Sequence, residues 1–126
     1  MVIKAVYNQD TLTDEVWYDS SMIKYSKMVE SPTENIGTLS IMFNNGTTYI
    51  YEDVLISDYV LVKAGGTDSS NGKALNKIIR GKYKYSKDLS APTLTEIQDK
   101  LANLLLEEQK ASVENTEEGP TDVFSE

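Results

Sequence analysis

The sequence predicts an α+β fold: a small antiparallel β-sheet, arranged as a meander around one hairpin, covered by short helices and followed by a long C-terminal amphipathic helix. Three observations lead to this prediction. Apolar and polar residues alternate through several short segments in the first half of the chain, which is typical of strands buried on one face. Asn45-Gly46 separates two of these segments and suits a tight hairpin turn. After Pro92, leucine and isoleucine recur at steps of three and four, as they do on one face of a helix.

Several strands are expected before residue 52. Turn-forming residues after Tyr7 and the proline-containing run 31–35 separate them. In the last of these strands, Tyr49 and Tyr51 point to one face of the sheet. There they either pack across strands or offer a stacking surface to a base. The expected strands cover residues 2–7, 15–18, 22–28, 37–43 and 47–51.

Two short helices and an exposed strand are expected next. Ser57 can cap a helix over residues 58–64, which Gly65 would end. A polar loop leads into a second helix over residues 73–80, and the alternating residues 82–85 suit an exposed strand. The second helix would bury an apolar face and expose a basic one. These faces hold Leu75, Ile78 and Ile79 on the apolar side and Lys73, Lys77 and Arg80 on the basic side.

The chain is expected to divide into three parts: an α+β domain over residues 1–90, an amphipathic helix over 91–110 and a disordered acidic tail over 111–126. Thr93 and Glu96 have the spacing of a capping box at the start of the helix. The apolar stripe of the helix can pack on the sheet of the same chain or join two copies, so a homo-oligomer formed through residues 93–110 remains open. The stripe consists of Leu94, Ile97, Leu101, Leu104 and Leu105.

Composition excludes several classes of function. The 126 residues contain no Cys and no His, which rules out disulfides, thiolate metal sites and a His-based catalytic triad. We therefore expect a protein that is not an enzyme and needs no cofactor. The formal net charge of −8 argues against binding to duplex DNA. We see neither a signal peptide nor a membrane-spanning run, and so expect a cytoplasmic protein, located in the host cytoplasm if a phage encodes it.

One segment, residues 72–87, is basic although the protein is acidic. It holds six of the twelve basic residues and no Asp or Glu. Such a segment can receive a phosphate, because lysines, serine hydroxyls and helix N-terminal amides would meet there. The predicted ligand-binding residues are Ser69, Ser70, Lys73, Asn76, Lys77, Arg80, Lys82 and Tyr83.

Each of these residues also has an ordinary structural interpretation. Ser70 and Lys73 can form a simple helix cap with a solvated lysine. Arg80, the one arginine of the chain, can bind an anion or pair with Asp53 or Asp58, and we slightly favour the structural pairing. Asn76, expected on the helix interior, can make a buried hydrogen bond or contact a ligand.

The chain also resembles a known family. An aromatic hairpin carrying Tyr49-Ile50-Tyr51 precedes a short helix that ends near Ala64. The motif continues with Ser70-Asn71-Gly72, Asn76 and Ile79-Arg80-Gly81-Lys82-Tyr83. Over residues 17–85 this pattern resembles the KTSC domain, a small module found at the C-terminus of some lysyl-tRNA synthetases and as a separate protein in many bacteria and phages. The resemblance implies a fold but does not imply a mechanism.

These observations support one leading hypothesis and two alternatives. The leading hypothesis is a non-catalytic binding protein of phage or prophage type, which sequesters a nucleotide or another phosphorylated small molecule and thereby antagonises host defence. The first alternative is a protein-interaction module that inhibits a host protein through the long helix and the acidic tail, in the manner of a nucleic-acid mimic. The second is RNA binding, which the family's association with lysyl-tRNA synthetases suggests.

Overall fold

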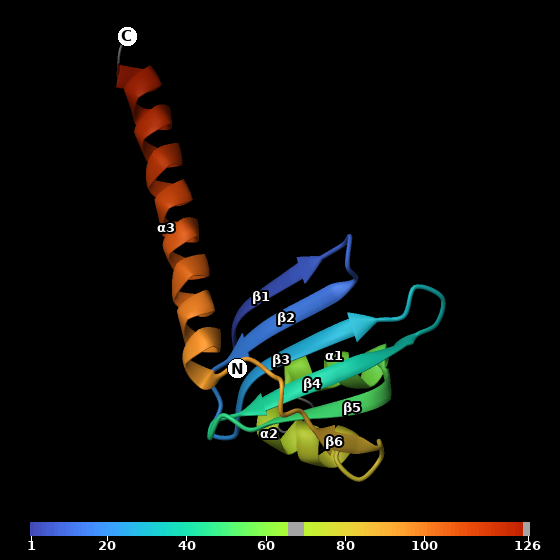
Figure 1. The fold of residues 1–126 in the computed structure, drawn as a ribbon. Helices are drawn as coiled ribbons and strands as arrows, with labels where there is room; N and C mark the ends of the chain where they lie inside the picture. Colours follow the sequence, from blue (N-terminus) through green and yellow to red (C-terminus); the bar gives the residue numbers. More distant parts are fainter. Residues whose placement is uncertain (66–69, 125–126) are drawn as a thin grey trace. The chain divides into compact units, whose positions relative to one another are not determined.

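The computed structural model describes the backbone of residues 1–65 and 70–124, and side chains as far as residue 109. It separates into two compact units, Met1–Leu94 and Thr95–Glu126. The first unit carries the sheet and the short helices (Figure 1). Together with the long C-terminal helix, these elements confirm the predicted α+β fold class.

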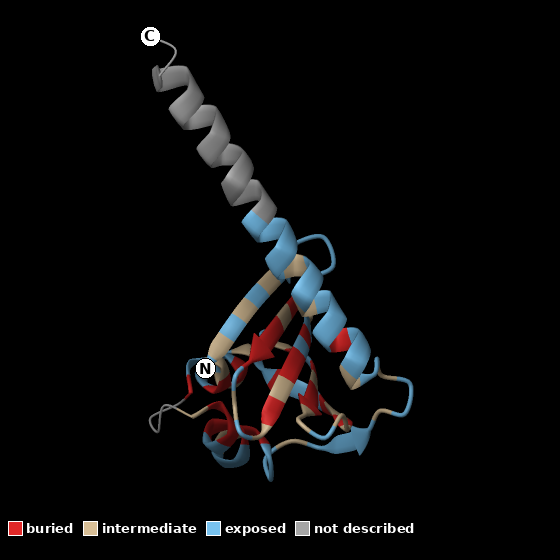
Figure 2. Ribbon diagram, turned by 90° about the vertical axis from the view of Figure 1, so that its left-hand side faces the viewer, coloured by how far each residue is buried: buried red, intermediate tan, exposed pale blue. Residues whose placement is uncertain are grey.

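The sheet is an antiparallel meander in which the six strands follow one another in chain order (Figure 1). β1 and β6 form its edges, and buried residues gather in the strands between them (Figure 2). The last strand begins at Tyr85, later than the predicted 82–85, because Tyr83 turns inward to a helix. The strands are β1 Val2–Asn8, β2 Thr13–Tyr18, β3 Ile23–Glu30, β4 Ile36–Phe43, β5 Thr48–Leu55 and β6 Tyr85–Lys87.

The central hairpin turns where the sequence predicts it, between β4 and β5. Gly46 adopts a φ of 90°, which glycine reaches without steric cost. Asn45 is not among the described residues with positive φ. The turn is therefore wider than the expected two-residue type, and it closes through a hydrogen bond of 2.9 Å from the Phe43 amide to the Thr47 carbonyl.

Two helical segments follow β5. Helix α1 spans Ile56–Ala64 and ends at Gly65, whose φ of 86° is left-handed as the sequence predicts. Its N-cap is Leu55, without a side-chain cap, so the predicted cap by Ser57 is wrong because the helix begins one residue before Ser57.

The second helical segment is not a regular α-helix. Helix α2 spans Asn71–Ala74, and its N-cap Ser70 accepts a hydrogen bond from the Lys73 amide. A π-helical turn, η2, then spans Leu75–Ile79, and the Arg80 amide donates to the Leu75 carbonyl at 2.9 Å, five residues back. The predicted regular helix over 73–80 is therefore corrected: it begins earlier and widens before Arg80.

The core lies between one face of the sheet and the helices α1, α2 and η2. Tyr59 and Val62 from α1 and Leu75 and Ile79 from η2 are all fully or nearly fully buried there. Tyr51 belongs to this core and Tyr49 packs against it, which confirms that the two tyrosines share a face. Strand side chains of the opposite face are also buried, namely Trp17, Tyr25, Met42 and Thr48.

Helix α3 spans Leu94–Phe124, and from Thr95 onwards it forms the second unit. A helix is present where the sequence predicts an amphipathic one, and the apolar stripe repeats at helical spacing. Helix α3 continues beyond residue 110, where the sequence predicts its end. The predicted disordered acidic tail over 111–126 falls on residues whose side chains the structure does not describe, so it remains a prediction.

Candidate functional site

A pocket of about 370 Å³, open to solvent, lies at one end of the sheet. The turn between β2 and β3, the turn between β4 and β5, and the residue that ends η2 form its walls. Alternate turns of an antiparallel meander fall at the same end of the sheet, which explains why these two turns meet. The lining residues are Ser21, Met22, Phe43, Asn44, Asn45, Thr47, Tyr49 and Arg80.

Asn44 ties the two turns together. Its backbone amide donates to the Met22 carbonyl and its side-chain amide donates to the Ser20 carbonyl, each at 2.9 Å. The hydroxyl of Ser20 in turn accepts hydrogen bonds from the amides of Met22 and Ile23. Among the described residues, the buried amide oxygen of Asn44 has no hydrogen-bond partner. One wall of the pocket is thus built from fixed backbone with an unused acceptor beside it.

Arg80 brings a positive charge to the pocket. It is the C-cap of η2, and its extended backbone (φ −68°, ψ 128°) turns the chain out of the helix. Its guanidinium donates to the Asn76 amide oxygen at 3.0 Å and lies 5.9 Å from the centre of the Phe43 ring. In the part of the chain that the structure describes, no carboxylate pairs with it. The expected ion pair with Asp53 or Asp58 is therefore wrong.

Aromatic rings continue from the pocket towards the edge of the sheet. Phe43 and Tyr49 meet edge to face, with ring centres 5.7 Å apart and planes at 74°. Tyr49 meets Tyr85 in the same way at 5.5 Å and 81°, and Tyr85 also lies 5.7 Å from Tyr51. We call these four rings the aromatic row. Tyr85, at its end, keeps 63% of its surface exposed.

Lys82 and Tyr83 lie against α1, where they hold Asp58. Lys82 Nζ is 2.8 Å from Asp58 Oδ2, and the Tyr83 hydroxyl donates to the same oxygen at 2.5 Å. The Tyr83 hydroxyl also accepts a hydrogen bond from the Leu55 amide at 3.2 Å. Burial opposes ionisation of Asp58, but the two hydrogen bonds and the charge of Lys82 hold its pKa below the ordinary value. These contacts form a structural brace between α1 and the segment that joins η2 to β6.

The other predicted site residues lie on α2 and η2 or before them. The Ser70 hydroxyl accepts from the Lys73 amide at 3.4 Å, which is the ordinary cap. Lys73 and Lys77 are exposed. Asn76 is exposed too, because Leu75 and Ile79 occupy the buried face; its placement on the helix interior is corrected. Ser69 lies outside the described residues.

Of the predicted ligand-binding residues that the structure describes, only Arg80 lies in the pocket wall. Sequence reasoning missed the two turns that supply the rest of the wall. The signal that could have found them is the meander itself, since it places the residues around Ser21 and around Asn44 at the same end of the sheet.

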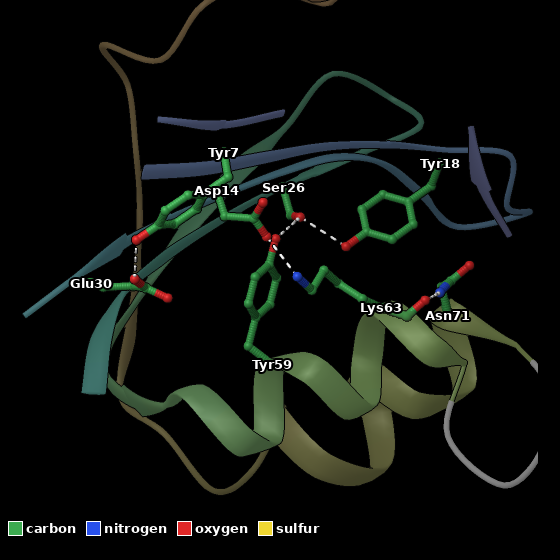
Figure 3. Close-up of polar contacts among 8 residues, drawn as sticks. All are labelled: Tyr7, Asp14, Tyr18, Ser26, Glu30, Tyr59, Lys63 and Asn71. Carbon is green, nitrogen blue, oxygen red and sulfur yellow. Dashed lines mark hydrogen bonds and ion pairs between the residues drawn. The ribbon is translucent and has the colours of Figure 1, made fainter. Parts of the chain in front are cut away.

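A second polar cluster lies inside the core, between the sheet and α1 (Figure 3). The hydroxyl of Ser26 lies 2.8 Å from that of Tyr18 and 2.9 Å from that of Tyr59. Beside them Lys63 Nζ pairs with Asp14 Oδ2 at 2.8 Å and lies 4.9 Å from the centre of the Tyr59 ring. Ser26 has no exposed surface, so a solute reaches it only if α1 opens.

Burial changes the acidity of this cluster. Burial raises the pKa of Tyr18 to about 12, although hydrogen bonds from Ser26 and Tyr59 act in the opposite direction. It raises the pKa of Tyr59 as well, and the neighbouring Tyr18 adds to that effect. Both tyrosines therefore remain neutral hydrogen-bonding groups at neutral pH, and the cluster stabilises the contact between α1 and the sheet.

Within residues 1–65 and 70–109, no group of three or more acidic residues is arranged to hold a metal ion. In the described part of the chain, no helix has the length and apolar character needed to span a membrane. No protein-family model matches the sequence, and a search of curated proteins finds no match. The resemblance to the KTSC domain consequently remains a hypothesis.

Proposed function

We propose that this protein binds an anionic aromatic small molecule of the nucleotide class in the pocket around Arg80. The observation that carries the proposal is the state of Arg80. Its guanidinium forms a wall of a pocket of about 370 Å³, and among the described residues only a neutral amide bonds to it. When an arginine has no carboxylate partner, no neighbouring negative charge compensates its own, and several of its N–H donors are free for a ligand.

The rest of the wall favours a nucleotide over a bare anion. Phe43 and Tyr49 provide aromatic surface beside the charge, which suits a base. Ser21, Asn45 and Thr47 add hydroxyl and amide groups that can bond to a sugar or to the edge of a base. A volume of 300–1,000 Å³ is common for small-molecule sites, and this pocket lies near the lower end of that range.

The pocket supports binding without chemistry. Ser21 and Thr47 supply its aliphatic hydroxyls, and the chain offers no His or Cys to activate either of them as a nucleophile. A protein of this kind acts by holding its ligand. Sequestration of a nucleotide signal, as by a phage-type antagonist of host defence acting in the cytoplasm, is the biological role that we propose for it.

Isothermal titration calorimetry of the full chain with four 5′-mononucleotides, a nucleoside and ribose 5-phosphate tests the proposal. We expect a mononucleotide to bind more tightly than either fragment. Arg80→Ala should weaken its binding by roughly 10- to 100-fold, the usual range for a hydrogen bond to a charged group, and Arg80→Lys should weaken it less. Lys73→Ala, which removes an exposed lysine outside the pocket, is the matched control.

Two outcomes would overturn the proposal. One is the absence of binding by every mononucleotide. The other is an equal loss of affinity in Arg80→Ala and Lys73→Ala, which would show a diffuse charge effect rather than a site. Thermal unfolding of each variant confirms that the fold is intact.

A further inference from the structure

The aromatic row extends beyond the pocket. Tyr85 is not among the residues that line the pocket, yet its ring centre lies 5.5 Å from that of Tyr49, which does line it. Tyr85 pairs with Tyr51 across β5 and β6, and Lys87 pairs with Tyr49. Side chains of paired residues point to the same side of a sheet. Tyr85 and Lys87 therefore continue the pocket surface to the open edge of the sheet.

The geometry of the two tyrosines matters for what they can bind. The planes of Tyr49 and Tyr85 are at 81° to each other. A flat base that stacks on one ring therefore cannot stack on the other. Since Tyr85 is 63% exposed while the neighbouring Tyr51, with its ring centre 5.7 Å away, is buried, Tyr85 presents a supported ring to solvent. The row thus contains two separate stacking surfaces, one inside the pocket and one beside it.

Positive charge accompanies the second surface. Lys87 is exposed and lies two residues after Tyr85, so its side chain shares the face of Tyr85, and it stands opposite Tyr49 in the strand register. A cation is thereby placed beside both stacking surfaces. Two acidic residues adjoin this segment: Glu52, whose backbone amide donates to the Lys84 carbonyl, and Asp88, whose carboxylate accepts hydrogen bonds from Ser90.

We propose that the site takes a dinucleotide. In this proposal, which rests on the proposed function, the first base and its phosphate occupy the pocket at Tyr49 and Arg80. The linking phosphate lies near Lys87, and the second base stacks on Tyr85. Two bases joined by a phosphodiester are the smallest ligand that fills both stacking surfaces and meets both positive charges.

The test compares three ligands of the same base: a 5′-mononucleotide, a 5′-phosphorylated dinucleotide and a hexanucleotide. We expect the dinucleotide to bind at least about 10-fold more tightly than the mononucleotide, because stacking of one further base contributes a factor of this order. The hexanucleotide should bind about as tightly as the dinucleotide. A steady increase of affinity with length would overturn the proposal in favour of a strand-binding surface.

Variants of Tyr85 assign the second base. Tyr85→Ala should weaken dinucleotide binding by roughly 5- to 100-fold and leave mononucleotide binding unchanged, while Tyr85→Phe should retain the affinity because it keeps the ring. Equal binding of both ligands, or an equal loss for both in Tyr85→Ala, would overturn the proposal. If the mononucleotide still binds through Arg80, the proposed function survives that failure. If neither ligand binds, both proposals fail.

Discussion

The guanidinium of Arg80 donates a hydrogen bond of 3.0 Å to the amide oxygen of Asn76, four residues earlier. The amide nitrogen of Asn76 faces the sulfur of Met22 at 3.8 Å, and Met22 lines the pocket. Asn76 thus links the arginine to a second residue that lines the pocket. Because the amide is neutral, it orients the guanidinium without cancelling its charge.

This relationship predicts the effect of Asn76→Asp. A carboxylate in place of the amide would pair with Arg80 and neutralise it. An exposed ion pair is worth up to about 1 kcal/mol, so we expect nucleotide affinity to fall by up to about 5-fold. Asn76→Ala should cost less, because it removes orientation but leaves the charge. Calorimetric affinities measure both, and an aspartate variant that binds as tightly as the parent would contradict the prediction.

The brace at Asp58 predicts acid sensitivity. Its pKa is held below the ordinary value of 3.8 in the folded protein. A group with a depressed folded pKa stabilises the fold above its unfolded pKa, and this contribution is lost as the pH falls through the folded pKa. Asp58→Asn should therefore lower the free energy of unfolding by about 2 kcal/mol at pH 7.

The difference should shrink as the pH falls below about 4, where the parent loses the same charge. Urea unfolding at a series of pH values measures it. Glu34→Gln, which changes an exposed carboxylate in the turn between β3 and β4, is the matched control. A difference between parent and Asp58→Asn that stays constant from neutral to acidic pH would contradict the role assigned to the brace.

The buried tyrosines predict a loss of stability in alkali. Burial raises the pKa of Tyr18 to about 12 and also raises that of Tyr59, above the ordinary value of 10.0. A raised folded pKa gives stability that is fully present below the unfolded pKa and is lost as the pH rises towards the folded pKa. The free energy of unfolding should therefore fall between about pH 10 and pH 12.

Tyr18→Phe isolates this effect. It removes one titrating hydroxyl, so the alkaline decline should become shallower, although the variant loses about 1 kcal/mol at neutral pH with the hydrogen bond to Ser26. Chemical unfolding monitored by fluorescence, together with the tyrosinate absorbance, follows both changes. An alkaline decline as steep in Tyr18→Phe as in the parent would assign the sensitivity to other groups.

The backbone organisation could be predicted because it depends on local patterns. Alternating residues produced the strands around the Asn45-Gly46 turn, and Gly65 ends α1 because a left-handed residue is needed there. The π-helical turn at Leu75–Ile79 could not be predicted, since a regular helix with the same residues presents nearly the same apolar face. That one extra residue per turn still changes where Arg80 leaves the helix.

The candidate site depended on contacts between distant segments. Which acid pairs with which base is decided by the packing of α1 against the chain after η2. Lys82 reaches Asp58 while Arg80 turns to the pocket, and the charge pattern of the sequence does not distinguish the two. The same holds for the pocket wall, which combines a turn near Ser21 with a turn near Asn44.

Two neighbouring residues of β5 should respond in opposite ways to the same substitution. Asp53 adopts a φ of 51°. It lies in an irregularity of the pairing with β4, where Glu52 and Asp53 together occupy the place opposite the single residue between Gly37 and Leu39. Both side chains are exposed. Valine favours extended strand positions but is strained at positive φ. Asp53→Val should therefore lower the free energy of unfolding by about 1–2 kcal/mol, whereas Glu52→Val should leave it unchanged or raise it slightly.

Urea unfolding of the two variants under identical conditions measures this contrast, and the chemical change is nearly the same in each. Asp53→Gly serves as a further control, because glycine accepts the left-handed conformation. This variant should unfold at a urea concentration at least as high as that of Asp53→Val. If valine is tolerated equally at both positions, residue 53 does not require a positive φ. The strand would then pair with β4 in a regular register in solution.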